Sequence, residues 1–208
     1  MPQVDTQLVF FMASILLALT PGPDNLFVLA QAAQHGKLAG ISVTMGLCTG
    51  LLVHTAAVAL GVAAIFQASA VAFALLKYIG AAYLLYLAWQ SFKAAAAASG
   101  PQQTRSLSFS GLYGRGIIMN ITNPKVSLFF LAFLPQFTDP ARGPLVPQIL
   151  LLGVLFIIST ILIFGGISFL AGGIGARLRK SAKAQILLNR LAACVFIALA
   201  VKLAMARR

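Results

Sequence analysis

Thr20-Pro21-Gly22-Pro23-Asp24-Asn25 interrupts an otherwise apolar run that extends from Leu8 to Ala33. Proline lacks a backbone N–H and clashes with the preceding turn, and glycine tolerates dihedral angles that other residues resist, so a helix cannot pass through this stretch unbroken. The twelve residues from Leu8 to Leu19 would form a helix of about 18 Å, shorter than the roughly 30 Å hydrocarbon core of a bilayer. We therefore predict one membrane span made of two half-helices, with the break near its centre.

The composition is typical of an integral membrane protein. Of the 208 residues, 60% are hydrophobic and only 9% are charged, and the mean hydropathy is +0.96. The formal net charge is +12, but the basic residues lie mostly between apolar runs, where they orient a membrane protein and meet anionic lipids. Nucleic-acid binding is therefore not expected. The first apolar run lacks a basic leader region and a small-residue cleavage site, so we predict a retained helix rather than a signal peptide.

The second half of the chain repeats the opening pattern. Gly111 to Met119 and Val126 to Phe137 are each too short to span a bilayer, and Asn120-Ile121-Thr122-Asn123-Pro124-Lys125 separates them. Continuous apolar runs predict four unbroken helices, at residues 38–66, 70–92, 145–171 and 184–206. We thus predict an all-α integral membrane protein of six transmembrane helices, of which helices 1 and 4 are broken. Its parts are a first three-helix repeat (1–93), a cytoplasmic linker (94–110) and a second three-helix repeat (111–208).

Two glycine spacings lie at or near the start of the second predicted helix and within it. They are Gly36-x-x-x-Gly40 and Gly46-x-x-x-Gly50. Small residues one turn apart let a neighbouring helix approach closely. We expect these glycines to lie at helix contacts.

Basic residues predict the orientation in the membrane. Connections one, three and five hold nine of them: Lys37, Lys93, Arg105, Arg115, Arg177, Arg179, Lys180, Lys183 and Arg190. The other side holds five: Lys77, Arg142, Lys202, Arg207 and Arg208. By the positive-inside rule, the odd connections are cytoplasmic and both termini face outward. Two halves of three helices each then insert in opposite senses, an arrangement typical of secondary transporters with a site near the midplane.

Asp24 and Lys125 are the candidate site charges, because each directly follows a proline of a break. Charges at this depth are costly and mark an ion pathway, a ligand counter-charge or an internal pair. A zwitterionic amino acid presents the complement of both: its ammonium group suits Asp24, and its carboxylate suits Lys125. The alternative is that Asp24 only caps the second half-helix and Lys125 only neutralises it. Capping and binding are compatible.

The predicted substrate site is the set of residues at the two breaks. It comprises Pro21, Gly22, Pro23, Asp24, Asn25, Asn120, Asn123, Pro124 and Lys125. Within it, we assign proton coupling to Asp24. The asparagines either satisfy the unwound backbone or contact substrate. His54 is more readily explained as a core histidine than as a proton relay.

Other functions fit the sequence less well than transport of an amino acid. A hydrolase is not expected, because the chain has no Glu and only two His residues. Cys48 and Cys194, both within apolar runs, are best explained as small core residues, although a carrier of thiols or reducing equivalents remains the alternative from another class. A divalent-cation exporter would be expected to show His-rich or acidic segments. We expect neither a metal site nor a cofactor.

The two break motifs resemble those of the LysE/RhtB family of bacterial amino-acid exporters. The resemblance rests on Thr20-Pro-Gly-Pro-Asp24-Asn25 and Asn123-Pro-Lys125, followed by Phe129-Phe130 and Phe133-Leu-Pro-Gln-Phe137, and it extends over the whole chain in length and helix count. Val126 stands where the family usually has a small residue. The branch of the family that exports lysine and arginine tends to carry Gln at the position of Asp24, so this chain is more similar to the exporters of threonine, homoserine and leucine.

This resemblance implies a multi-pass protein of the bacterial inner membrane that exports neutral amino acids. Export would be driven by proton influx, without a nucleotide or metal cofactor. The expected partners are the amino acid, protons and the lipid bilayer, and a homodimer is left open.

Overall fold

The computed structural model describes residues 1–20, 22–68, 70–93, 108–171 and 182–205, and within these ranges every regular element is helical. The long helices are α3 (Lys37–Ala68), α4 (Ala70–Lys93), α7 (Leu145–Leu170) and α9 (Ala182–Met205). Their ends differ by at most two residues from those predicted, which confirms the four continuous helices. The predicted linker lies outside the described residues except at its end. There, the next helix begins two residues earlier than expected, at Phe109.

The first predicted break is confirmed. Helix α1 (Val4–Leu19) is capped by Thr20, whose backbone N–H donates to the carbonyl oxygens of Leu16 and Leu17. Helix α2 (Pro23–His35) begins at a proline. This residue suits the first position of a helix, because a backbone N–H there would have no acceptor within the helix. The axes of α1 and α2 are bent by 61° relative to each other.

The second break is also confirmed, although the segment after it is less regular than predicted. Helix α5 (Phe109–Ile121) is followed by α6 (Pro124–Leu128), and the segment Pro124–Phe137 is bent by 50° relative to α5. Instead of one helix up to Phe137, the chain continues as a π-helical turn, η1 (Phe129–Phe133), and a 3-10 turn, η2 (Leu134–Phe137). Pro135 explains this change, because it has no N–H for an α-helical bond and its ring would clash with the preceding turn. A short 3-10 turn, η3 (Pro140–Arg142), follows.

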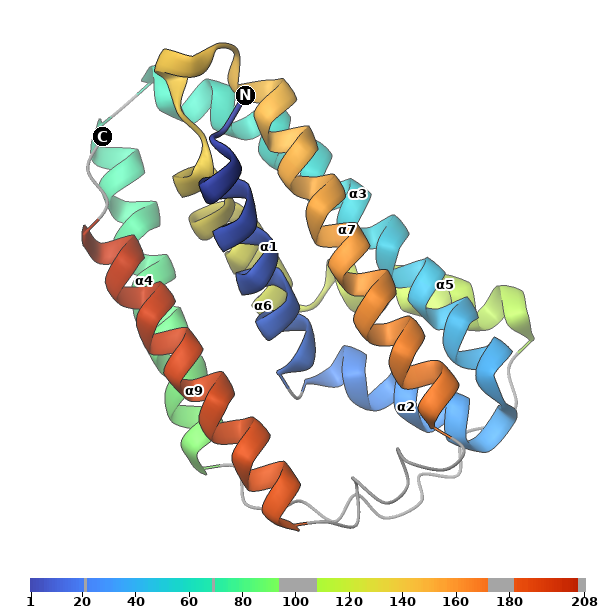
Figure 1. Cartoon of the computed structure of the whole chain (residues 1–208). Coiled ribbons are helices and arrows are strands. Elements are labelled where there is room, and N and C mark those ends of the chain that lie inside the picture. The colour runs from blue at the N-terminus through green and yellow to red at the C-terminus, as the bar shows by residue number, and fades with distance from the viewer. Residues whose placement is uncertain (21, 69, 94–107, 172–181, 206–208) are drawn as a thin grey trace.

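The helices are arranged around the two breaks (Figure 1). Helices α3, α5 and α7 pack together with α2 on one side, α4 pairs with α9 on the other, and α1 and α6 lie between them. Lys37–Gly61 within α3 and Leu145–Leu170 are each long and apolar enough to cross a membrane. Counting each bent pair as one span gives up to four spans among the described residues.

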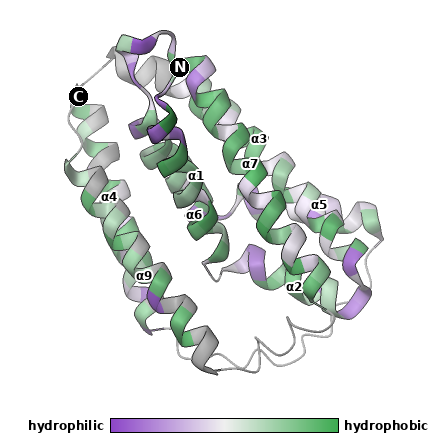
Figure 2. Ribbon diagram, viewed as in Figure 1, coloured by the Kyte–Doolittle hydropathy of each residue, from purple (hydrophilic) through white to green (hydrophobic). Residues whose placement is uncertain are grey.

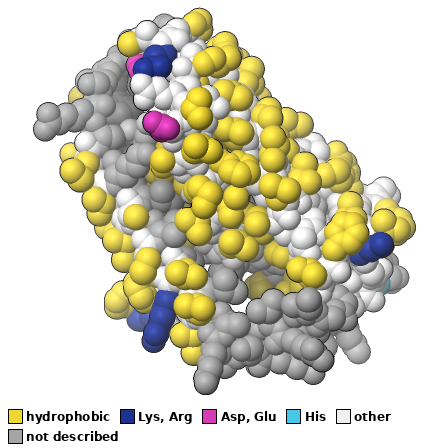
Figure 3. All heavy atoms as spheres, in the orientation of Figure 1, with side chains coloured by type: hydrophobic (Ala, Val, Ile, Leu, Met, Phe, Trp, Pro, Cys, Tyr) yellow, Lys and Arg dark blue, Asp and Glu magenta, His cyan; other side chains and the backbone are white. Residues whose placement is uncertain are grey.

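Hydrophobic residues cover most of the length of the helices, whereas the first turn of α2 is hydrophilic (Figure 2). On the face shown in Figure 3, apolar side chains form a broad band and basic side chains lie toward its ends. Such a band is suited to contact with lipid chains rather than water. The prediction of an all-helical membrane protein is therefore confirmed.

Glycines bring α3 and α5 unusually close. A Cβ added at Gly46 would overlap the carbonyl oxygen of Tyr113, and one at Gly116 would lie 2.5 Å from the carbonyl oxygen of Val43. A Cβ at Gly50 would lie 2.6 Å from Oδ1 of Asn120. The second predicted glycine pair therefore does permit a close helix contact.

The first glycine pair has a different role from the one predicted. Gly40 does pack closely, with Ser168 of α7 as its neighbour, but Gly36 faces open space. Gly36 instead ends α2 with a φ of 87°, a left-handed conformation that glycine adopts without steric cost. The prediction was wrong for Gly36 because spacing alone does not distinguish a packing glycine from a turn glycine.

Two clusters of buried apolar residues make up the core. The larger cluster includes the phenylalanines of α1, η1, η2 and α7, with Phe10 in contact with the rings of Phe129 and Phe137. The smaller cluster joins α2, α3, α5 and the second half of α7, and includes Val28, Leu112 and Phe164. The two clusters meet at the breaks.

Candidate functional site

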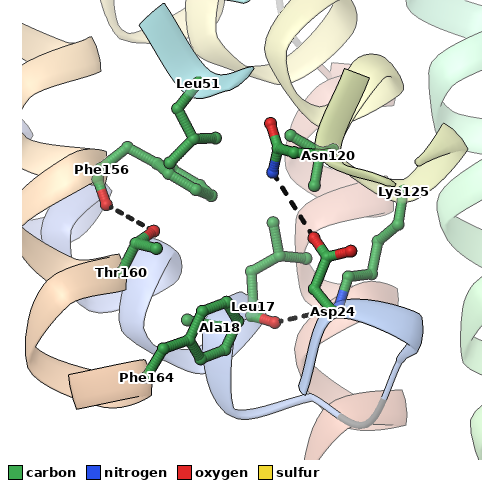
Figure 4. A pocket seen from close by; sticks show the side chains of 10 residues that line it. Leu17, Ala18, Asp24, Leu51, Asn120, Lys125, Phe156, Thr160 and Phe164 are labelled. Carbon is green, nitrogen blue, oxygen red and sulfur yellow. Dashed lines mark hydrogen bonds between the residues drawn. The ribbon is translucent and has the colours of Figure 1, made fainter. Parts of the chain in front are cut away.

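A small cavity lies where the two core clusters meet (Figure 4). The space open to the centre of a water-sized sphere is about 20 Å³, roughly enough for one water molecule. Six helices contribute the ten lining residues: Leu17, Ala18, Asp24, Leu51, Asn120, Lys125, Val126, Phe156, Thr160 and Phe164. The cavity therefore combines both breaks with one face of α7.

Asp24 lies in the first turn of α2, where the partial positive charge of a helix N-terminus favours a carboxylate. Its side chain is buried, and Oδ2 accepts a long hydrogen bond of 3.5 Å from Nδ2 of Asn120. Oδ1 has no hydrogen-bond partner among the described residues. One carboxylate oxygen thus remains available to a cation.

Lys125 joins the second break to the first. Its buried Nζ donates to the carbonyl oxygens of Leu17 at 3.3 Å and of Thr20 at 3.2 Å, at the end of α1. These carbonyls lie at the negative end of the helix dipole, which stabilises a cation. Gly22 is also close, because a Cβ added there would lie 3.1 Å from Nζ.

Asp24 and Lys125 line the same cavity, yet no salt bridge within 4.0 Å joins them. A salt bridge does form in the described part of the chain between the exposed side chains of Arg142 and Asp139, at 3.3 Å. Lys125 is hydrogen-bonded by α1 instead of being paired with Asp24. The interpretation that Lys125 only neutralises Asp24 therefore does not account for its contacts.

The asparagines hold the breaks in shape. Nδ2 of Asn25 donates to the carbonyl oxygen of Ala18, and Oδ1 of Asn123 caps α6 by accepting from the backbone N–H of Lys125. Asn120 instead faces the cavity and contacts Asp24. Several buried polar atoms keep no partner in the described part of the chain: Oδ1 of Asp24, Oδ1 of Asn25, Oδ1 of Asn120 and Nδ2 of Asn123.

His54 lies behind Asn120 rather than in the cavity. Its Nε2 is 3.2 Å from the backbone carbonyl oxygen of Asn120. A carbonyl oxygen only accepts, so this contact as a hydrogen bond requires the hydrogen on Nε2. The ring also packs against Phe130, with 5.6 Å between centroids. His54 therefore contacts the backbone of Asn120 and does not line the cavity itself.

Of the nine predicted site residues, the structure brings Asp24, Asn120 and Lys125 to the cavity wall. Asn25 and Asn123 are buried beside it, Gly22 is half-buried, and Pro23 and Pro124 are exposed at the first positions of their helices. Pro21 lies outside the described residues. Pro23 and Pro124 thus shape the breaks without lining the cavity.

Sequence reasoning missed the contribution of α7. Phe156, Thr160 and Phe164 recur every four residues, so they lie on one face of the helix. The pair Ser159-Thr160, inside a strongly apolar run, was the available signal, because polar groups at this depth are favoured where they face a cavity or another helix.

The cysteines and the possible metal ligands are not gathered at one place. Cys48 is buried in α3 and Cys194 is exposed on α9, and both are free thiols. Within the described ranges, no group of three or more His, Cys, Asp or Glu residues is placed to hold a metal ion.

Comparison with known proteins gives matches along nearly the whole chain. Residues 15–207 match the model of the LysE type translocator family. The chain is 34% identical over 198 residues to the homoserine/homoserine lactone efflux protein of Salmonella typhimurium, covering 95% of each protein. It is 32% identical over 203 residues to the leucine efflux protein of the same organism, covering 94% of this chain and 92% of the relative. An uncharacterized membrane protein of Vibrio cholerae is 30% identical over 200 residues, covering 96% and 97%. No solved structure matches the chain significantly.

Proposed function

Because the chain belongs to the LysE type translocator family, we propose that it exports a neutral amino acid across the bacterial inner membrane in exchange for protons. Relatives named for the efflux of homoserine and of leucine support this class of substrate. The observation that carries the proposal is the shared cavity, in which a buried carboxylate and a buried ammonium group come from two different helix breaks.

The chemistry of this cavity suits a zwitterion. The unpaired Oδ1 of Asp24 is an acceptor for the substrate ammonium group. Lys125 supplies a positive charge for the carboxylate, and can turn toward it by exchanging one of its bonds to the end of α1. A substrate carboxylate would replace such a contact, in which only the donor is charged, with an ion pair in which both partners are charged.

We propose that six spans in two inverted halves surround this site. Support comes from the two broken helices, one in each half, and from the pairing of equivalent helices, α3 with α7 and α4 with α9. The N-terminus and the last turn of α9 also lie toward the same end of the molecule in Figure 1, as an even number of spans requires. Alternating access then opens the site to one face at a time.

Asp24 is the group proposed to couple export to protons. Burial favours the neutral form of a carboxyl group, whereas an adjacent cation favours the ionised form. An arriving substrate ammonium group would therefore displace a proton from Asp24, and release of the substrate would let a proton return from outside. Asn120 contacts the same carboxylate group through its long hydrogen bond of 3.5 Å.

The test uses inside-out membrane vesicles with labelled neutral amino acids, with and without a pH gradient. Asp24→Asn should fold, because Asn has nearly the same shape as Asp and the N-cap of α2 is Gly22, without a side-chain capping bond, but it should lose accumulation against a gradient. Asp5→Asn is the matched control, since Asp5 is an exposed acid in the first turn of α1, and it should transport normally. Uphill, pH-dependent transport by Asp24→Asn would show that Asp24 does not couple.

A further inference from the structure

The cavity has two unlike walls (Figure 4). Asp24, Asn120 and Lys125 lie on one side, and the α7 face formed by Phe156, Thr160 and Phe164 lies across from them. An amino acid that places its ammonium and carboxylate groups among the charges would therefore direct its side chain toward α7. This orientation rests on the proposed function.

The α7 wall is fixed by its packing. The ring of Phe156 lies 5.3 Å from that of Phe129 and 5.0 Å from that of Phe130, between centroids. Phe164 is buried in the smaller core cluster, about two turns farther along the helix. The rings of Phe156 and Phe164 thus form the two ends of the α7 wall and limit the length of a substrate side chain placed between them.

Thr160 supplies a polar group between the two rings. Its hydroxyl donates to the carbonyl oxygen of Phe156 at 3.0 Å, so its hydrogen is engaged, whereas the oxygen can still accept. The side chain is buried at 2% exposure. A substrate hydroxyl that reaches this wall therefore has an acceptor in surroundings that are otherwise apolar.

No charged residue exists anywhere in α7 (Leu145–Leu170). A charged substrate side chain at this wall would be desolvated without a counter-charge, which is strongly unfavourable. Long side chains are disfavoured as well, because each added carbon at this closely packed wall requires further separation of helices.

We propose that Phe156, Thr160 and Phe164 form the side-chain subsite of the transporter, and that this subsite selects short uncharged side chains and prefers those that carry a hydroxyl group. Thr160 accepts the hydroxyl, and the two rings limit length. Basic and acidic amino acids are excluded by the absence of a counter-charge on the same wall.

The test is competition between matched amino acids in inside-out vesicles, using homoserine against norvaline and threonine against valine. The members of each pair differ by a hydroxyl in place of a methyl group. The wild type should favour the hydroxylated member in kcat/KM. Thr160→Val should reduce that preference roughly 3- to 10-fold, the value of one neutral hydrogen bond. Thr160→Ser should retain it.

Ser159→Ala is the matched control for loss of a hydroxyl. Ser159 is buried in the same turn of α7 and donates to the carbonyl oxygen of Leu155 at 2.9 Å, but it does not line the cavity. This variant should leave the preference unchanged. An equal loss in Ser159→Ala and Thr160→Val, or no loss in Thr160→Val, would overturn the subsite.

Phe164→Ala tests the limit on length. It should raise the kcat/KM of leucine or phenylalanine relative to threonine, because the variant removes one boundary of the wall. Phe169→Ala, which changes a 63% exposed ring on the same helix, should not. Normal export with unchanged relative preferences in Phe164→Ala would reject the subsite alone. Wild-type vesicles that move no neutral amino acid would reject the proposed function as well.

Discussion

Lys125 shows how much a single residue depends on backbone atoms in this protein. Its Nζ is held by two carbonyl oxygens of the first break, more than one hundred residues away in the chain. Gly22 leaves just enough room for this contact. The position of the ammonium group is therefore set in large part by the end of α1.

Gly22→Ala should disturb the site while sparing the fold. The added Cβ would meet Nζ at 3.1 Å and Cε at 3.7 Å, so the flexible end of the lysine must move. We expect kcat/KM for export to fall about tenfold or more, because small misplacements of a binding group are costly. Thermal unfolding in detergent should change little.

Gly114→Ala is the control for Gly22→Ala, since a Cβ there meets nothing within 4 Å. It should transport like the wild type. If Gly22→Ala were equally active, the fixed position of Lys125 would be unimportant for transport.

Among the elements, α3 and α5 hold the second break against the rest of the molecule. Gly50 of α3 contacts Asn120, the residue that bonds Asp24. Two residues of α3 thus position Asn120. Gly50 lies against its side chain, and His54 contacts its backbone carbonyl oxygen. A change in the packing of α3 against α5 would therefore move Asn120, which lines the cavity.

Gly50→Ala should destabilise the protein and impair export together. The new Cβ would lie 2.6 Å from Oδ1 and 2.7 Å from Cβ of Asn120, so the backbones must separate. Overpacking of this kind costs about 1–3 kcal/mol of unfolding free energy. Thermal unfolding and vesicle uptake measure the two effects.

Gly61→Ala, in the same helix but facing open space, should be neutral or slightly stabilising, since alanine favours a helix over glycine. Wild-type stability of Gly50→Ala would mean that α3 and α5 can separate without cost.

The sequence predicted the helices and breaks well because their signals are local. Proline, glycine and asparagine interrupt an apolar run wherever they occur, so residues 20–25 and 120–125 stood out. The π-helical turn at Phe129–Phe133 was missed because the apolar run was expected to form one helix up to Phe137, although Pro135 within that run disfavours a continuous α-helix. The partners of Lys125 were also missed, because backbone carbonyls have no sequence signature, and Phe156 and Phe164 resembled any other core residue.

At the scale of the whole molecule, both sides of the cavity are closed by apolar packing. The larger cluster includes buried residues of α1, η1, η2, α4, α9 and the first half of α7, and the smaller cluster includes buried residues of α2, α3, α5 and the second half of α7. The cavity has no room for an amino acid in this arrangement. Substrate entry therefore requires helices to separate.

Tags fused before Met1 and after Arg208 should both report an extracytoplasmic location in intact cells. This follows from six spans with nine basic residues in the odd connections and five on the opposite side. The opposite result for the C-terminal tag alone would indicate an odd number of spans, and would exclude two inverted three-helix halves.

The unpaired arrangement of Asp24 and Lys125 has an electrical consequence. With a zwitterion bound, the two charges of the site and those of the substrate cancel, so the loaded site carries no net charge through the membrane field. After release, a protonated Asp24 leaves Lys125 as one positive charge, on which the field acts with about 2.3 kcal/mol per 100 mV. An interior-negative potential would then accelerate the return of the substrate-free site, but it would not change the rate of the step that carries the substrate outward. At saturating amino acid, an imposed interior-negative potential should therefore increase the maximal rate of the whole export cycle.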